Sequence, residues 1–446
     1  MAETEPMTSE LEVAQEQYLT EACKKENVCD SDDTARPMLE QNNWSVDVAG
    51  RVYRQQKLVP PPLSHAETYD TTNPPIVEKK SIVIGLLGTI DRDRDDTASP
   101  EGDGWFISDF YLWKHVLKGM GSEQIWMTCL DPQYLCEKYV LGGHGANKSW
   151  SDGYIHGRPT AERVVVLDEA TLPFAKKDLK LCKETSLLNE YLETLESKFA
   201  DAQKTNRPIV LLMFGHGDIE NCGDKKGGLQ IAIEDPSKAS QADFLTADKI
   251  VDIHSRYPEV RLTLFMTSCY SGYWVATPYF KAAENINIIA GAREWEQTHS
   301  WKQSSSLRHA GGVFSSGFLE ELKQEPSDPS QHHEAREYQH FVRDLAASVP
   351  GLSVDETVER GLASLPSFTP STTSEKFYAR TGYELHHYKK NYDGLKRIPA
   401  SRMERERDRT GGSSSSSGSY GPGRRLARAV SYLATKYKRS KIGRRK

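Results

Sequence analysis

The chain has 446 residues, 37% of them hydrophobic and 27% charged, and a formal net charge of −6. This length permits one large domain with tails, or two domains. Residues 1–50 carry twelve acidic and three basic side chains, whereas residues 421–446 carry ten basic and no acidic ones. No apolar run approaches the roughly 18 residues of a membrane span, and the acidic first twenty residues lack the apolar core of a secretory signal.

The seven cysteines are scattered along the chain and odd in number. That usage is typical of reduced thiols in an intracellular protein rather than of a disulfide framework. We therefore expect a cytoplasmic protein, with the nucleus as the alternative.

Four segments differ in composition. Residues 1–78 are acidic and then proline-rich, so we expect them to be disordered. One ordered domain is predicted at 79–325, followed by a helical extension at 326–410. A serine–glycine linker and a basic tail occupy 411–446. We expect the tail to contact an anionic partner or an import receptor, with a solvated tail as the alternative.

Apolar periodicity predicts the elements of the ordered domain in chain order. Buried strands are predicted at 81–87, 123–129, 209–214, 262–267 and 286–292, with a short strand or half of a hairpin at 162–167 and an exposed strand at 227–233. Helices are predicted at 104–119, 186–202, 246–257, 272–283 and 311–322. Strand, helix and strand at this spacing indicate right-handed crossovers. The expected fold is therefore α/β, with a mostly parallel sheet flanked by helices.

One cysteine stands directly after a buried strand. The apolar run from Leu262 to Thr267 stops at Ser268-Cys269, and a helix is expected to begin near Gly272. A sulfur at a helix N-terminus lies near backbone N–H groups, and these favour the thiolate, which is the nucleophilic form. Cys269 is therefore the candidate nucleophile.

A histidine ends another predicted strand, 53 residues earlier, in Gly215-His216-Gly217. Ligands gather at the carboxyl ends of strands in an open parallel sheet, so His216 and Cys269 are expected at the same edge. A cysteine–histidine pair supports acyl transfer, in which the thiolate attacks a carbonyl and the imidazolium protonates the leaving amine. The amide N–H groups of Gly217 and Cys269 are the expected oxyanion hole.

These residues and their neighbours also have simpler, structural interpretations. A lone cysteine at a strand end is usually a small buried apolar residue, and a lone histidine is usually structural; their pairing favours the catalytic interpretation. A second Gly-His-Gly at 143–145 follows only a short apolar run. Ser271 is a weaker nucleophile candidate, because Cys-Tyr-Ser-Gly is not a Gly-x-Ser-x-Gly turn.

Together these motifs resemble those of the caspase-like cysteine peptidases, which include caspases, metacaspases and legumain-type endopeptidases. Phe214 to Asp218 matches their strand ending in His-Gly, and Thr267 to Gly272 is similar to the metacaspase Asp-Ser-Cys-x-Ser-Gly pattern. The resemblance covers about 79–325. It implies a three-layer α/β sandwich, and cysteine endopeptidase activity through a thioester acyl-enzyme on a polypeptide substrate.

The resemblance also implies substrate-binding residues. Ser300-Trp301-Lys302 resembles the caspase Ser-Trp-Arg that lines the substrate cleft, and Arg92 or Arg94 matches the caspase pocket arginine. Thr267 stands where related enzymes have Gln, Glu or Asp in the primary specificity pocket. Lys302 replaces an arginine and does not bind a carboxylate bidentately. The cleavage-site preference is therefore left open.

No cofactor is expected. The aspartates at 91, 93, 95 and 96 are a weak candidate for calcium, because two arginines interleave with them. Two alternatives to an endopeptidase also stay open, a catalytically inactive interaction or scaffold protein and a transpeptidase that uses the same dyad.

Overall fold

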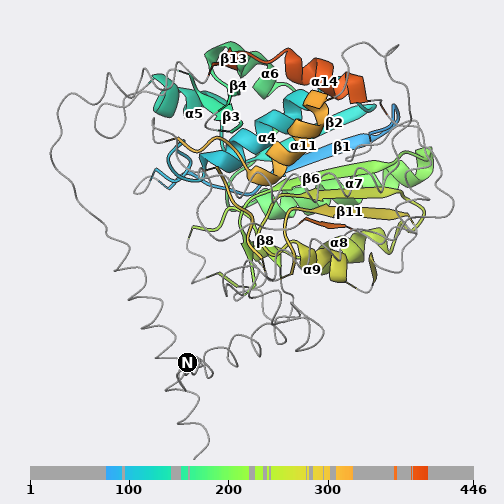
Figure 1. Ribbon diagram of the computed structural model, residues 1–446. Coiled ribbons are helices and arrows are strands. Elements are labelled where there is room, and N and C mark those ends of the chain that lie inside the picture. Colours follow the sequence, from blue (N-terminus) through green and yellow to red (C-terminus); the bar gives the residue numbers. More distant parts are fainter. Residues whose placement is uncertain are drawn as a thin grey trace, which may run out of the picture. The chain divides into compact units, whose positions relative to one another are not determined.

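The computed structural model describes residues 77–92, 96–141, 152–158, 161–219, 227–234, 239–240, 243–277, 279–280, 285–294, 296–301, 308–324, 366–368, 383 and 385–399. They form an α/β fold around a seven-stranded sheet (Figure 1). Its strands lie side by side in the order β12 (Ser367–Phe368), β11 (Ile286–Ala290), β10 (Leu262–Met266), β6 (Ile209–Phe214), β1 (Ile82–Leu87), β2 (Glu123–Thr128) and β5 (Leu179–Leu181). Only β12 runs antiparallel to its neighbour. The predicted fold class, a mostly parallel sheet flanked by helices, is confirmed.

Two small antiparallel sheets accompany the main one. The first contains β3 (Tyr154–His156), β4 (Arg163–Leu167) and β13 (Arg397–Ile398). The second contains β7 (Gly217–Asp218), β8 (Gly228–Gln230) and β9 (Phe244–Leu245). The first strand of this second sheet, β7, begins directly after His216. The sheet therefore starts shortly after β6 ends.

The longer helices are α4 (Gly104–Val116), α7 (Leu187–Thr205), α8 (Ala247–His254), α11 (Val313–Gln324) and α14 (Leu385–Asp393). The shorter ones are α5 (Pro132–Leu135), α6 (Leu172–Lys176), α9 (Gly272–Ala276), a π-helical turn at Cys136–Leu141 and a 3₁₀ turn at Glu169–Thr171. The helix α4 is buried along its whole length, which suits a sequence that is apolar on most sides. The helix α7 instead buries one stripe, Leu187, Tyr191, Leu195, Phe199 and Ala202.

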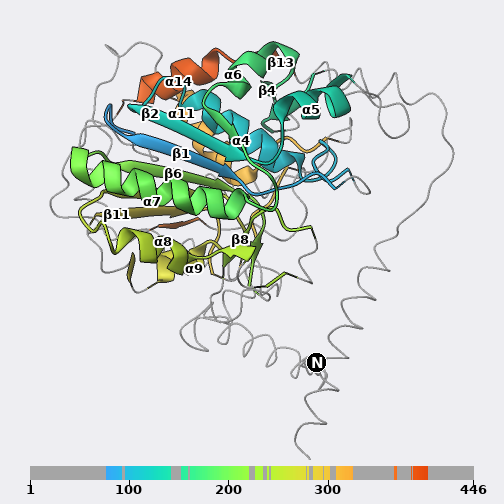
Figure 2. The same ribbon diagram turned by 180° about the vertical axis from the view of Figure 1, so that it is seen from behind.

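Both faces of the main sheet are buried. Successive side chains of a strand point to opposite faces, so one strand contributes to two hydrophobic clusters. In β1, Val83 and Leu87 join one hydrophobic cluster, whereas Ile84 and Leu86 join the other. Residues of α4, α11 and α14 belong to the first cluster, and residues of α7, α8 and α9 belong to the second. The helices therefore cover the two faces as separate layers (Figures 1 and 2).

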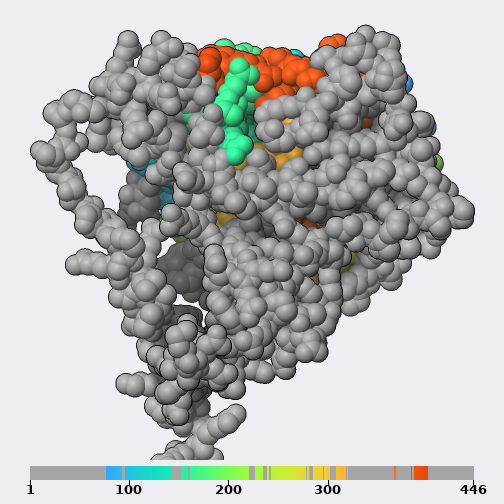
Figure 3. All heavy atoms as spheres, viewed as in Figure 1, coloured from blue at the N-terminus to red at the C-terminus, as the bar shows by residue number. Residues whose placement is uncertain are grey.

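Several elements differ from the sequence-based expectation. The strand β8 is buried rather than exposed, and α9 ends at Ala276 rather than at 283. Beyond residue 325, β12 joins the main sheet, β13 joins the sheet of β3 and β4, and α14 packs on α4 and α11. The space-filling view shows part of the 385–399 segment at the surface, in red (Figure 3). Lys390 and Asp393 of this segment are exposed.

Most of the predicted helical extension at 326–410, nearly all of the acidic N-terminal region and the whole basic tail lie outside the residues given above. Within those residues, no helix is long and apolar enough to cross a bilayer.

Gly85, in the middle of β1, lies under the indole of Trp126. A Cβ at this position would come within 2.1 Å of the ring, whereas a Cβ at Gly394 would meet its nearest atom at 3.4 Å. We expect Gly85→Ala to lower the free energy of unfolding by about 1–3 kcal/mol through overpacking. The matched Gly394→Ala should stay within about 0.5 kcal/mol of wild type. Urea denaturation of both variants checks this, and equal stabilities would contradict it.

Candidate active site

The strands that carry His216 and Cys269 are direct neighbours in the sheet. The strands β6 and β10 pair in parallel with Met213 opposite Met266, and the Thr267 amide donates to the Met213 carbonyl at 3.2 Å. The two strands therefore end at the same edge. His216 follows β6 after one glycine, and Cys269 comes three residues after the end of β10.

The two strand ends touch through their main chains at Gly217. A Cβ on this glycine would lie 1.8 Å from the Cys269 carbonyl oxygen and 3.2 Å from its Cα. No side chain fits at that distance, so the contact requires glycine here. The glycine after the histidine thus brings the main chain beside His216 against that of the cysteine.

Burial determines the state of the Cys269 thiol. Its Sγ atom lies 3.6 Å from the Thr298 hydroxyl and 3.8 Å from the Thr298 carbonyl oxygen. Burial raises the pKa of the Cys269 thiol, and it outweighs the opposing hydrogen bonds from Thr298 and from the main chain of Gly217 and Cys269. Main-chain groups do act in favour of the thiolate, but their effect on the pKa is smaller than that of desolvation. The helix α9 has only five residues, and desolvation dominates.

The residue after Cys269 has an unusual backbone conformation. Tyr270 has φ of +59°, in the left-handed region that residues other than glycine rarely occupy. Its amide donates to the Glu296 carbonyl at 2.8 Å, which ties the turn to the segment that holds Thr298. Non-glycine residues in this conformation cluster at functional sites, where the surrounding structure enforces them.

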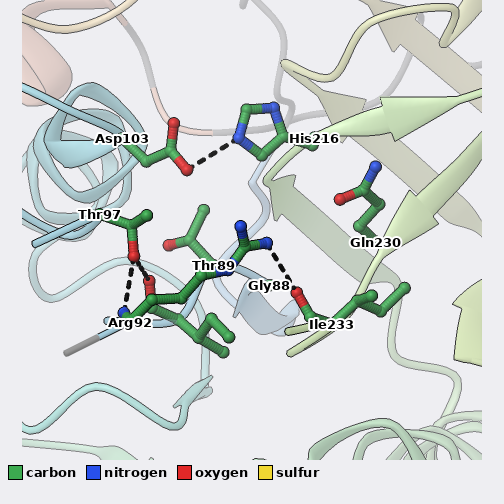
Figure 4. Close-up of a pocket in the computed structure, with 9 residues that line it drawn as sticks. Gly88, Thr89, Arg92, Thr97, Asp103, His216, Gln230 and Ile233 are labelled. Atoms are coloured by element: carbon green, nitrogen blue, oxygen red, sulfur yellow. Dashed lines mark hydrogen bonds and ion pairs between the residues drawn. The ribbon is translucent and has the colours of Figure 1, made fainter. Parts of the chain in front are cut away.

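His216 is held by the start of α4. Its Nε2 atom lies 2.9 Å from Asp103 Oδ2, and the edge of its ring packs on Phe106 with the ring centroids 4.8 Å apart. Figure 4 shows the Asp103 carboxylate pointing at the imidazole. The His216 side chain is 43% exposed. Within the part of the chain that the structure describes, no hydrogen bond joins His216 to Cys269.

A small pocket of about 20 Å³ opens beside His216. Its lining comes from the end of β1, the turn before α4 and the end of β8: Gly88, Thr89, Ile90, Arg92, Thr97, Asp103, His216, Gln230 and Ile233 (Figure 4). Arg92 donates through one terminal nitrogen to the Ile233 carbonyl at 3.1 Å. Its Nε atom is buried and has no hydrogen-bond partner among the described residues. The pocket thus combines one cation with the histidine–carboxylate pair.

Of the other predicted substrate-binding residues, those that the structure describes do not line this pocket. Trp301 is fully buried in the core, where its indole N–H donates to the Ser316 hydroxyl at 2.7 Å, so it lines no cleft in this structure. Thr267 is 1% exposed and likewise lies in the interior. The Ser300 hydroxyl lies 3.1 Å from His309 Nδ1. The two remaining predicted residues, Arg94 and Lys302, fall outside the described residues.

The weaker candidates have structural roles or fall outside the described ranges. Ser271 is fully buried, and its hydroxyl accepts from the Ala292 amide at 3.3 Å. The Asp91 carboxylate is occupied by Lys138 at 2.9 Å and by the Tyr139 hydroxyl at 2.7 Å. Among the described residues, no group of three or more His, Cys, Asp or Glu side chains has the arrangement of a metal site. His144 lies outside these residues.

Sequence reasoning missed Asp103, Thr298 and Gln230. Asp103 directly precedes an apolar helical segment, where an aspartate ordinarily serves as a helix cap. Thr298 lies in a segment without periodicity, so no pattern marks it. Gln230 was included in a predicted strand, but nothing in the sequence indicated that it faces His216.

The sequence matches no protein-family model and no curated protein sequence. Among solved structures, the crystal structure of caspase-1 from Spodoptera frugiperda is similar to this chain at 10% sequence identity and a TM-score of 0.34. The alignment covers 70% of this chain and 93% of that chain. A likeness this distant does not assign roles to residues, so the chemistry must come from the site itself.

The raised pKa of the Cys269 thiol makes its reactivity depend on pH. Only the thiolate reacts with iodoacetamide, so alkylation of Cys269 should increase with pH around a midpoint above that of a free cysteine, about 8.5. Site-resolved mass spectrometry measures the rate, with N-acetylcysteine as the reference thiol.

Thr298→Val is the matched variant for this measurement. It removes a hydroxyl that lowers the pKa of the thiol, so the midpoint should move further upward. A wild-type midpoint below pH 7, or no movement in the variant, would contradict this assignment.

Proposed function

We propose that this chain is a cysteine endopeptidase, with Cys269 as the nucleophile and His216 as the acid–base residue. The observation that carries the proposal is the contact between Gly217 and the Cys269 main chain, which brings the two strand ends together. A partly exposed histidine and a partly exposed cysteine then flank one main-chain junction. This combination is what acyl transfer by a thiol requires.

In the proposed reaction, Cys269 Sγ attacks the carbonyl carbon of a peptide bond while His216 accepts the thiol proton. The carbonyl oxygen then carries the negative charge and accepts hydrogen bonds from the Gly217 and Cys269 amides. The carbon–nitrogen bond breaks as His216 returns the proton to the leaving amine. Water then attacks the thioester, His216 accepts its proton, and the thiol is released with the carboxylic acid.

The arrangement of the amides supports the assignment of the oxyanion hole. The main-chain groups of Gly217 and Cys269 both act to lower the pKa of the Cys269 thiol, which is the effect expected of N–H donors near the sulfur. The thiol is protonated at neutral pH in the resting structure, so the proton transfer to His216 accompanies substrate attack.

Arg92 is the residue of the pocket that we propose for substrate selection. Its guanidinium lies in the same small pocket as His216, and its Nε has no partner among the described residues. A guanidinium with donors to spare binds carboxylates well. Peptides with an acidic side chain near the scissile bond are therefore the first substrates to test. Contributions from Arg94, Ser300 and Lys302 stay predictions.

The central test compares wild type with Cys269→Ala and His216→Ala on a peptide library. We expect wild type to cleave, and each variant to lose at least about 10²-fold in kcat/KM, because each removes an essential group. Cys182→Ala is the matched control, since it removes a buried thiol directly after the edge strand β5, which β2 and β1 separate from β6, and it should keep wild-type activity. Equal cleavage by all four proteins would refute the assignment, as would no cleavage by wild type.

One observation favours a second candidate, a non-catalytic interaction protein on the same fold. The resting thiol has a raised pKa, and no hydrogen bond links it to His216 among the residues described. An electrophilic peptide probe separates the two functions. Labelling of Cys269 no faster than that of Cys129 or Cys182 supports the interaction protein. An added amine that appears in a ligated product would instead identify a transpeptidase.

A further inference from the structure

We propose that Asp103 is a positioning residue for His216, which its carboxylate holds in one tautomer for proton transfer with Cys269. The inference rests on the proposed function and adds a third residue to it. Asp103 and His216 are 113 positions apart, and their side chains meet at 2.9 Å at the mouth of the pocket (Figure 4).

The position of Asp103 on its helix supports a role beyond capping. Asp103 is the N-cap residue of α4, yet its side chain makes no hydrogen bond to the first turn of that helix. Two other aspartates at N-caps of this chain do cap their own helices. Asp131 accepts from the Gln133 amide at 2.8 Å, and Asp168 accepts from the Thr171 amide at 3.0 Å. Asp131 and Asp168 have the extended backbone of a capping residue, whereas Asp103 has φ of −77° and ψ of 5°, so its carboxylate is not turned to its own helix and binds His216 instead.

The main chain around Asp103 is fixed on both sides, so the carboxylate has little freedom to move. The Asp103 amide donates to the Thr97 carbonyl at 2.7 Å, and the Gly104 amide donates to the Ser99 carbonyl at 3.0 Å. From the opposite direction, the His309 amide donates to the Pro100 carbonyl at 2.7 Å. A rigid turn is what a positioning residue requires, because its effect depends on where it holds its partner.

The contact fixes which nitrogen of His216 can act as the base. A carboxylate only accepts hydrogen bonds, so Nε2 carries the proton and Nδ1 keeps its lone pair. Nδ1 is then the atom that takes the proton of the Cys269 thiol. The imidazolium formed in that step is stabilised by the adjacent carboxylate, whose charge offsets that of Arg92 in the same pocket. The group that packs on the ring from α4, Phe106, is uncharged.

The test compares Asp103→Asn and Asp103→Glu with wild type. Asp103→Asn keeps the size of the side chain and removes its charge, and we expect it to lower kcat by about 10²–10³-fold with little change in KM. Asp103→Glu should recover part of the loss. The matched control Asp131→Asn, at a cap remote from His216, should stay within about twofold of wild-type kcat.

A second readout does not depend on peptidase activity. Nitrogen-15 NMR of the His216 ring in the Cys269→Ala background reports its tautomer, and we expect the Nε2-protonated form in the parent and a mixture once Asp103→Asn is added. An unchanged tautomer, or wild-type kcat in Asp103→Asn, overturns the positioning role. If no protein cleaves any peptide but the tautomer changes as expected, the proposed function fails while the hold of Asp103 on His216 stands.

Discussion

The site depends on how closely two neighbouring strands approach each other where they end. Pairing of β6 with β10 places Met213 opposite Met266, and this register determines which residues face each other beyond the strands. A shift of one residue would reverse which face each side chain occupies. Past the last paired residues, Gly217 lies so close to the Cys269 carbonyl that only hydrogen fits in place of a side chain. Main-chain geometry therefore determines how closely His216 and Cys269 approach each other.

A buried aspartate–histidine pair holds together the elements around α4. Asp109 on α4 and His156 on β3 are both fully buried, and their side chains meet at 2.9 Å. The Asp109 carboxylate also accepts from the Gly312 amide at 2.8 Å and from the Ser315 hydroxyl at 2.9 Å, at the start of α11. Removing one member of a buried pair leaves an uncompensated charge, which costs about 3–5 kcal/mol. The Asp109 carboxylate therefore links β3 and the start of α11 to α4, and Asp103 is the N-cap residue of α4.

The sequence predicted best the strands that are continuous apolar runs and the helices whose apolar residues recur at helical spacing. The strands at 82–87, 209–214, 262–266 and 286–290 follow from short apolar runs, and α4 and α7 follow from helical spacing. The sequence did not predict the elements that depend on contacts between only a few residues. The two-residue strands β12 and β13 exist because β11 and β4 offer unpaired edges, and no local pattern announces that. The burial of Trp301 depends on Ser316, which is 15 residues away.

The candidate site was predicted in the same partial way. The sequence predicted His216 and Cys269 at one edge of the sheet and Gly217 as an oxyanion donor, but it did not predict the close contact of Gly217 with the Cys269 main chain. Nothing distinguished Asp103 from an ordinary helix cap, since both uses need the same residue at the same position. The state of the thiol was also beyond reach. Its pKa depends on how many atoms surround the sulfur, and Thr298 comes from a distant part of the chain.

The last described segment has a consequence for how the protein is made. Asn391 on α14 donates to the Val116 and Lys118 carbonyls at the end of α4, while β12 completes the edge of β11. Residue 368, at the end of β12, follows the end of β11 by 78 positions. At about 5–20 residues per second, a ribosome needs roughly 4–16 s to cross that interval. During this time the nascent chain already contains the cysteine strand but not the pieces that close its sheet, so a chaperone that meets the chain in this window meets an open edge.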